Sequence, residues 1–213
     1  MLQSPNERNM QTAEATEKII LGIDPGTNVM GYGVLRVCGR KPELVVMGVL
    51  QLKKLESHYL RLKRIYERVL GLIEQYHPDE MAIEAPFVGI NPSSMIKLCR
   101  AQGVAMAAAV ERDIPIFEYS PAKVKIQVVG NGAASKEQVA AMVKNTLRLT
   151  DSDMNEKFDA SDAVAIALTH HYMTARPDMT GGSSAKSKIP RSSDGGSSSW
   201  NTFIAQHADR VHK

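Results

Sequence analysis

Three apolar segments of this chain carry carboxylates at or near their ends, and no other feature narrows the possible folds so far. The carboxylates are Asp24, which ends the first segment, Glu84 in the second, and Asp159 with Asp162 at the start of the third. An ionised side chain is seldom left at the end of an apolar segment without a partner, because desolvating a lone charge is costly. We therefore expect the three segments to bring their carboxylates to one point.

The spacing of apolar residues predicts strands that alternate with helices. We expect strands at residues 18–24, 31–37, 43–51, 80–85 and 114–119, and helices at residues 57–76, 92–112, 121–129, 135–149 and 158–174. Short links join the first three strands, which indicates an antiparallel meander. This order predicts an α/β fold with a mixed five-stranded sheet flanked by helices. It is similar to the ribonuclease H-like arrangement, in which the first strand is central and carries an acid.

Composition divides the 213 residues into one domain and two polar ends. Residues 1–16 are polar and aperiodic, and we expect a disordered extension there. Residues 177–213 are rich in glycine and serine and predict a flexible tail. The domain itself is expected at residues 17–176.

Cysteine usage and hydropathy indicate a cytoplasmic protein. Cys38 and Cys99 lack metal-ligand spacing, which favours a reducing compartment over a disulfide framework. No stretch has the roughly 18 uncharged apolar residues of a membrane span, and no secretory signal is apparent at the N-terminus.

Charge is compatible with nucleic-acid binding without proving it. The formal net charge is +3. One region, residues 120–150, has a single acidic residue, Glu137, beside a run of basic ones. A solvated basic face explains such a run as well as a DNA contact does. The basic residues are Lys123, Lys125, Lys136, Lys144 and Arg148.

Asp24 and Glu84 each allow a structural as well as a catalytic interpretation. An aspartate before Pro25-Gly26 commonly caps its own turn. Glu84 is harder to explain in this way, because it follows three apolar residues and a buried glutamate needs a partner or an ion.

Asp159 and Asp162 are three residues apart, so a helix places them on one face. They could act as an N-cap and a first-turn acid, but the apolar run after Asp162 indicates a helix start that lies against the sheet. Four carboxylates that converge without a matching set of basic residues predict a site for Mg²⁺ or Mn²⁺ rather than zinc. Such a site indicates a metal-dependent hydrolase acting on phosphodiesters. We interpret His170 and His171 as helix histidines with satisfied hydrogen bonds rather than as ligands.

A series of short motifs along residues 18–172 carries a resemblance to one family. The motifs are Gly-Ile-Asp-Pro-Gly-Thr with Gly31-Tyr32-Gly33-Val34, Ala82-Ile83-Glu84 followed by Phe87, Gly103-Val104-Ala105, Phe117-Glu118-Tyr119, Val124-Lys125, Val128-Val129-Gly130, and Asp159-Ala160-Ser161-Asp162-Ala163 with Ala165-Ile166-Ala167. In this order they resemble the RuvC family of crossover-junction endodeoxyribonucleases, the bacterial Holliday junction resolvases. The N-terminal extension and the glycine- and serine-rich tail depart from the family pattern.

The resemblance implies a homodimer that binds a four-way DNA junction and nicks two opposed strands symmetrically during recombination and repair, leaving 5′-phosphates and 3′-hydroxyls. It further implies two Mg²⁺ ions per site, with Mn²⁺ able to substitute, and cooperation with a branch-migration motor complex. The implied metal-binding catalytic residues are Asp24, Glu84, Asp159 and Asp162. The implied DNA-binding residues are Phe87, which would stack at the junction, and Lys125 and Lys136 near the active site.

The residues leave two other functions open. Asp24-Pro25-Gly26-Thr27 followed by Gly31-Tyr32-Gly33 resembles the first phosphate-binding loop of actin-like kinases and ATPases, although those proteins need a duplicated second domain for which this chain is too short. A non-catalytic junction-binding protein of the same fold would be expected to lack at least one of the four carboxylates. This chain has all four.

Overall fold

A computed structural model describes residues 17–86, 91–154 and 158–175. Five strands form one sheet in the order β3-β2-β1-β4-β5. The strands β1, β2 and β3 are antiparallel neighbours, whereas β1, β4 and β5 run parallel. This mixed sheet with the first strand at its centre confirms the predicted fold class. The strand bounds are β1 (Glu17–Asp24), β2 (Val29–Cys38), β3 (Lys41–Gln51), β4 (Glu80–Glu84) and β5 (Ile116–Tyr119).

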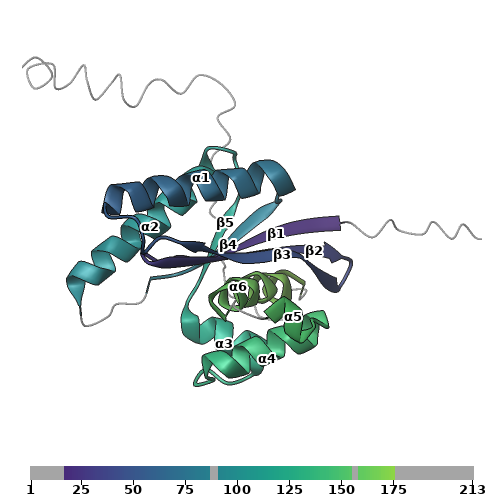
Figure 1. Cartoon of the computed structure of the whole chain (residues 1–213). Coiled ribbons are helices and arrows are strands. Elements are labelled where there is room, and N and C mark those ends of the chain that lie inside the picture. The colour runs from purple at the N-terminus through teal and green to yellow at the C-terminus, as the bar shows by residue number, and fades with distance from the viewer. Residues whose placement is uncertain (1–16, 87–90, 155–157, 176–213) are drawn as a thin grey trace, which may run out of the picture. The chain divides into compact units, whose positions relative to one another are not determined.

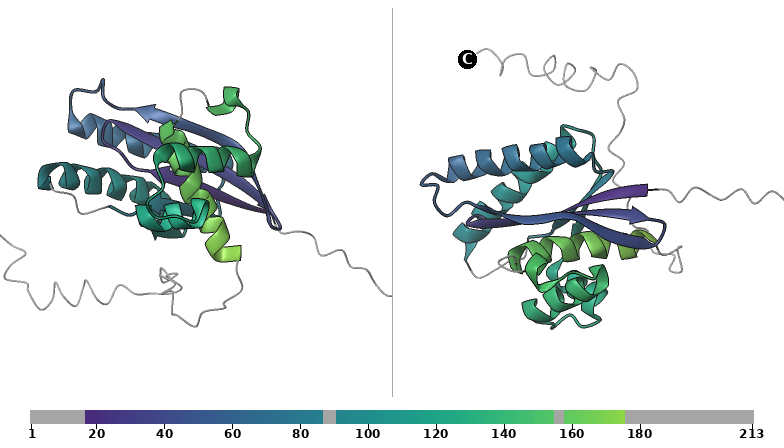
Figure 2. Two further views of the ribbon diagram at one scale, coloured as in Figure 1. Left: turned by 90° about the horizontal axis from the view of Figure 1, so that it is seen from below. Right: turned by 45° about the vertical axis from the view of Figure 1, so that its right-hand side comes forward.

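Helices cover both faces of the sheet (Figure 1). One face packs against α1 (His58–Tyr76) and α2 (Pro92–Val110), and the other against α3 (Pro121–Val129), α4 (Lys136–Leu147) and α6 (Phe158–Ala175). The right-hand view of Figure 2 shows the same separation. These elements begin and end within two residues of their predicted bounds. The short helix α5 (Asp151–Met154) was not predicted.

Polar side chains determine where the helices begin. Ser57, Asn91, Ser120 and Ser135 each accept a hydrogen bond from a backbone N–H in the first turn of α1, α2, α3 and α4. Ser135 forms a complete capping box with Gln138. This cap makes Lys136 the first residue of α4.

The alternation of side chains along the strands decides which residues face α6. Ile20 of β1 and Ala82 of β4 pack in the core cluster formed with α6, whereas Leu21 packs in the cluster on the other face. Because side chains two residues apart share a face, Asp24 and Glu84 also lie on the α6 side.

The helix α6 lies against β1 and β2 with very little space between the backbones. A Cβ atom at Gly22 would lie 2.2 Å from the backbone oxygen of Ala163, and one at Gly33 would lie 2.5 Å from Cγ2 of Val164. Only glycine permits this approach. The two glycines therefore set the depth at which α6 holds its acidic residues.

Several predictions concern residues that the structure does not describe or features at its surface. The expected extension at residues 1–16 and tail at residues 177–213 lie outside the described residues. Within the described ranges, no helix has both the length and the hydropathy that crossing a bilayer requires. Cys38 and Cys99 are both exposed and unpaired.

Replacement of Gly22 by alanine should destabilise the protein, because the new methyl group would meet the backbone of α6. Overpacking of this kind costs about 1–3 kcal/mol of unfolding free energy. Urea denaturation of Gly22→Ala beside wild type measures the loss. The control is Gly71→Ala in α1, where a Cβ meets nothing within 4 Å and the helix gains up to about 1 kcal/mol in propensity. Equal stability of Gly22→Ala and wild type would contradict the close approach of α6.

Candidate functional site

A cleft of about 250 Å³ lies where β1 and β4 end beside α6. These strands are parallel neighbours with Ile23 opposite Ile83, so Asp24 and Glu84 end adjacent strands side by side. The cleft is lined by Asp24, Glu84, Pro121, Val124, Lys125, Lys136, Val139, Asp162 and Ile166. The structure thus brings three of the four predicted acids together, from two strands and a helix.

Asp24 and Glu84 hydrogen-bond to each other through their carboxyl groups. Burial raises the pKa of Asp24 to about 8, and the nearby charges of Glu84 and Asp162 contribute to the rise. Burial also raises the pKa of Glu84. Two carboxylates this close cannot both ionise cheaply, so the pair holds a proton at neutral pH.

Asp162 reaches the cleft from the N-terminal part of α6. Its Oδ2 accepts a hydrogen bond from Nζ of Lys136 at 2.8 Å. Because Lys136 is the first residue of α4, the cap at Ser135 places this cation beside the acid.

The expectation that the acids converge without basic partners is therefore wrong. Lys136 pairs with Asp162, and Lys125 of α3 lines the same cleft. Both lysines act to lower the pKa of Glu84, although burial outweighs them. The resemblance implied both lysines near the active site, and the cleft contains them. The pairing of Lys136 with Asp162 was not foreseen, because the two residues lie on separate elements.

Glu84 has a further support that sequence reasoning missed. Gln102 of α2 is only 5% exposed. Its Nε2 donates to the backbone oxygen of Glu84 at 3.2 Å and to Oε2 of Glu118 at 2.8 Å. A glutamine within an alanine-rich helix was the available signal, since buried amides need partners.

Two predicted site residues are described only in part or not at all. Asp159 is the second residue of α6. Its side chain is outside the described residues, as is the whole of Phe87.

The lining of the cleft suits a hard cation, because it offers carboxylate oxygens and no sulfur. In the arrangement seen, no three acidic, histidine or cysteine side chains within the described part of the chain are placed to coordinate one ion. In this arrangement Asp24 and Glu84 share a proton, and Asp162 is held by Lys136. Coordination would require the carboxyl pair to lose its proton and Asp162 to exchange its lysine for the ion.

Comparison with known proteins identifies the family. Residues 20–170 match the family model described as crossover junction endodeoxyribonuclease RuvC. This chain belongs to the RuvC family. Its relatives include the crossover junction endodeoxyribonuclease RuvC of Bacteroides fragilis, 54% identical over 92% of this chain and 96% of the relative. The RuvC of Porphyromonas gingivalis is 50% identical over 92% of this chain and 97% of the relative.

A solved RuvC structure agrees with the fold. Thermus thermophilus RuvC in complex with a Holliday junction substrate is 33% identical to this chain and superposes with a TM-score of 0.68. The match covers 74% of this chain and 95% of the T. thermophilus chain. The protein is therefore an endodeoxyribonuclease of the RuvC type, a class of enzyme that acts on phosphodiester bonds and typically depends on metal ions.

The metal-free protein should lose stability as the pH rises from about 4 to about 8. The folded-state pKa of Asp24 is raised from 3.8 to about 8. A raised carboxyl pKa means that the unfolded chain releases its proton first, so the stabilisation present at low pH is lost as the pH climbs to the folded value. We expect a loss of more than about 1.4 kcal/mol, the free energy of one pKa unit. Urea denaturation in a chelator at pH 5 and pH 8.5 measures it.

Asp24→Asn should remove most of this pH dependence, because the amide cannot ionise. The matched control is Asp151→Asn, which removes a carboxylate whose side chain is 91% exposed. The variant Asp24→Asn should be more stable than wild type at pH 8.5 and similar to it at pH 5. A wild-type protein whose stability stays flat across this range would show that Asp24 and Glu84 do not share a proton.

Proposed function

We propose that this protein resolves four-way DNA junctions by metal-dependent hydrolysis of phosphodiester bonds at the acidic cleft. The observation that carries this proposal is the convergence of Asp24, Glu84 and Asp162 in one cleft whose remaining polar lining is two lysines. Membership of the RuvC family supports the choice of substrate, since the T. thermophilus relative was solved with a Holliday junction. Recombination and repair are the processes in which such junctions arise.

We propose that Asp24, Glu84, Asp159 and Asp162 hold two Mg²⁺ ions per site, with Mn²⁺ able to substitute. Ions bound there would lower the pKa of the attacking water and stabilise the leaving 3′ oxygen, which gives a 5′-phosphate and a 3′-hydroxyl. Asp24 and Glu84 must give up their shared proton to act as ligands. Metal binding should therefore compete with protons below about pH 8.

The lysines of the cleft would bind the scissile strand. Lys136 is engaged by Asp162 in the present arrangement. An ion bound to Asp162 would replace that contact with Lys136, and the ammonium group would then attract a DNA phosphate within the cleft. Lys125, half-buried on α3, faces the same cleft and would contribute a second phosphate contact.

Phe87 is proposed to stack on a base at the junction. It follows Glu84 by three residues in the sequence, just beyond the end of β4. Base stacking on an aromatic side chain contributes about 1–3 kcal/mol. An aromatic group near Glu84 would hold the strand exchange point open and direct the scissile phosphate toward the acids.

A homodimer is proposed because two symmetric nicks need two identical sites. A two-fold dimer presents such sites to a junction that has two-fold symmetry itself. Cooperation with a branch-migration motor complex is carried over from the family resemblance. We place the protein in the cytoplasm, where the unpaired Cys38 and Cys99 stay reduced.

The substrate experiment uses a labelled four-way junction, linear duplex and ATP, each with Mg²⁺ or with a chelator. We expect the junction to be cleaved, and the linear duplex and ATP to stay intact. Cleavage should occur with Mg²⁺ and not with the chelator. Each amide variant, namely Asp24→Asn, Glu84→Gln, Asp159→Asn and Asp162→Asn, should cleave more than about 100-fold more slowly, since even residues that only support metal ligands cost 10–100-fold. Junction binding should persist or tighten, because the amide removes charge and hardly changes volume.

The matched control is Glu43→Gln, an exposed carboxylate of β3 outside the cleft, which should cleave at the wild-type rate. Near-normal cleavage by any of the four amide variants would exclude that residue as a metal ligand. Hydrolysis of ATP with an intact junction would replace the proposal by the phosphotransferase alternative.

Lys125→Ala and Lys136→Ala should weaken cleavage and flatten the salt dependence of junction binding. Each lost phosphate contact lowers the slope of log affinity against log salt by about 0.9 on duplex DNA. Fluorescence anisotropy with a labelled junction across a salt series gives the slope. The control is Lys41→Ala, which removes an exposed lysine of β3 outside the cleft. This variant should leave the salt slope unchanged. An unchanged slope in both cleft variants would place Lys125 and Lys136 away from the DNA.

A further inference from the structure

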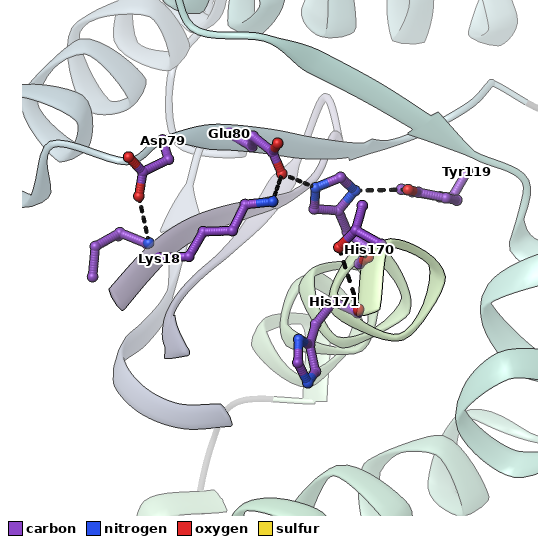
Figure 3. Close-up of polar contacts among 8 residues, drawn as sticks. Lys18, Asp79, Glu80, Tyr119, His170 and His171 are labelled. Atoms are coloured by element: carbon purple, nitrogen blue, oxygen red, sulfur yellow. Dashed lines mark hydrogen bonds and ion pairs between the residues drawn. The ribbon is translucent and has the colours of Figure 1, made fainter. Parts of the chain in front are cut away.

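A second polar cluster lies on the same face of the sheet, at the end of β4 that carries Glu80, whereas Glu84 at the other end lines the cleft. Figure 3 shows the contacts of this cluster. Its centre is His170 of α6, whose side chain is fully buried. Both ring nitrogens have partners: Nδ1 contacts the hydroxyl of Tyr119 at 2.7 Å, and Nε2 contacts Oε2 of Glu80. Lys18 of β1 pairs with the same oxygen of Glu80. The prediction that His170 has satisfied hydrogen bonds is confirmed.

The partners of His170 belong to the strands that also support the cleft. Glu80 begins β4 and Glu84 ends it. Tyr119 ends β5, where it lies opposite Glu84 in the sheet and its backbone oxygen accepts from the N–H of Ala85 at 2.8 Å. The side chain of His170 therefore contacts Glu80, the first residue of β4. It also contacts Tyr119, which pairs with Glu84, the last residue of β4.

The lengths of β4 and α6 match between the two polar sites. From Glu80 to Glu84 the strand advances four residues, about 13 Å. From Asp162 to His170 the helix advances eight residues, about 12 Å. Since His170 contacts Glu80 and Asp162 shares the cleft with Glu84, α6 runs opposite to β4 with one contact near each end.

The charge states of the cluster make its hydrogen bonds directional. Burial raises the pKa of Tyr119 to about 12, so its hydroxyl stays protonated and can donate to Nδ1. Burial opposes ionisation of Glu80, but hydrogen bonds from His170 and Lys18 outweigh it and lower the pKa of this carboxyl. Glu80 thus accepts from Nε2–H, and contacts at both ring nitrogens fix the orientation of the His170 ring. The ring of Phe117 packs against it, with centroids 4.4 Å apart.

The close packing at Gly22 and Gly33 sets the depth of α6, and the hydrogen bonds of His170 add a directional constraint. Residues 163–168 of α6 are all buried, so this part of the helix is packed on every side. Apolar contacts of this kind have no preferred direction. Hydrogen bonds from one imidazole to two fixed partners cannot shift without being broken.

We infer that His170, held by Tyr119 and Glu80, is a positioning residue that aligns α6 with β4 and so sets the separation of Asp162 from Glu84 in the cleft. This inference rests on the proposed function, because it concerns the carboxylates that would bind metal there. His170 acts through the helix it anchors and does not itself reach the cleft.

The experiment compares His170→Ala, His170→Gln and Tyr119→Phe with wild type. Two quantities are measured: the affinity for Mn²⁺ by calorimetry without DNA, and the rate and half-saturating Mn²⁺ concentration of junction cleavage. For His170→Ala we expect both to worsen by about 10–100-fold, as for other residues that orient metal ligands. His170→Gln keeps an amide N–H toward Glu80 and should recover part of the loss. Tyr119→Phe keeps the ring, loses one hydrogen bond and should show a several-fold effect.

The matched control is Thr169→Ala. Thr169 is the neighbouring buried residue of α6, and its hydroxyl donates to the backbone oxygen of Ala165 in the same helix. The control variant should lower the melting temperature without changing Mn²⁺ affinity or the metal requirement. The inference is overturned if the His170 and Tyr119 variants, at the same folded fraction, behave as Thr169→Ala does. If His170→Ala does not fold, Tyr119→Phe decides. A wild-type protein that binds Mn²⁺ yet leaves junctions intact would contradict the proposed function, while the Mn²⁺ affinities would still decide the positioning role.

Discussion

The approach of α6 to the central strands is the constraint on which the acidic cleft depends. Adjacent parallel strands bring Asp24 and Glu84 together by themselves, but the third carboxylate comes from a helix. A helix that packs on ordinary side chains lies about 10 Å above a sheet, roughly the spacing of packed layers. Gly22 and Gly33 remove the side chains that would hold α6 away from β1 and β2. Asp162 can then reach the strand ends from its place near the start of the helix.

Three carboxylates in one cleft repel each other, and two exchangeable positive charges reduce this repulsion in the folded protein. One is the proton shared by Asp24 and Glu84, and the other is the ammonium group of Lys136 on Asp162. Both can leave: the proton by titration, and the lysine by rotation of a side chain that is 63% exposed. The acids are thus compatible with folding in the absence of metal and are still accessible to an ion that competes for them. A fully buried, permanent salt bridge would have closed the site instead.

The sequence was sufficient for the strands, most helices and the convergence of three of the four acids, because local pattern shows where each element ends and the acids stand at those ends. Apolar runs, caps such as Ser135 and the position of Glu84 at a strand end can be read over a few residues. What sequence reasoning missed depends on contacts between distant elements. Gln102 donates a hydrogen bond to the backbone of Glu84, which is 18 residues away in the sequence. Lys136 pairs with Asp162, which is 26 residues away. Neither contact is specified by local sequence: the resemblance placed Lys136 near the active site, but its pairing with Asp162 depends on the packing of α4.

The polar cluster around His170 is better explained by alignment than by stability. Replacing a buried ionic group with apolar residues of similar size is often neutral or stabilising, whereas polar partners specify register. Here the register has a consequence, because a helix that slips by one residue turns its side chains by about 100°. Such a turn would carry Asp162 away from Glu84. Glu80 and Glu84 occupy the two ends of one row of β4, with only Ala82 between them on that face. At one end, Glu80 contacts His170 and helps to hold α6 in place. At the other end, Glu84 shares the cleft with Asp162, whose position depends on the position of α6.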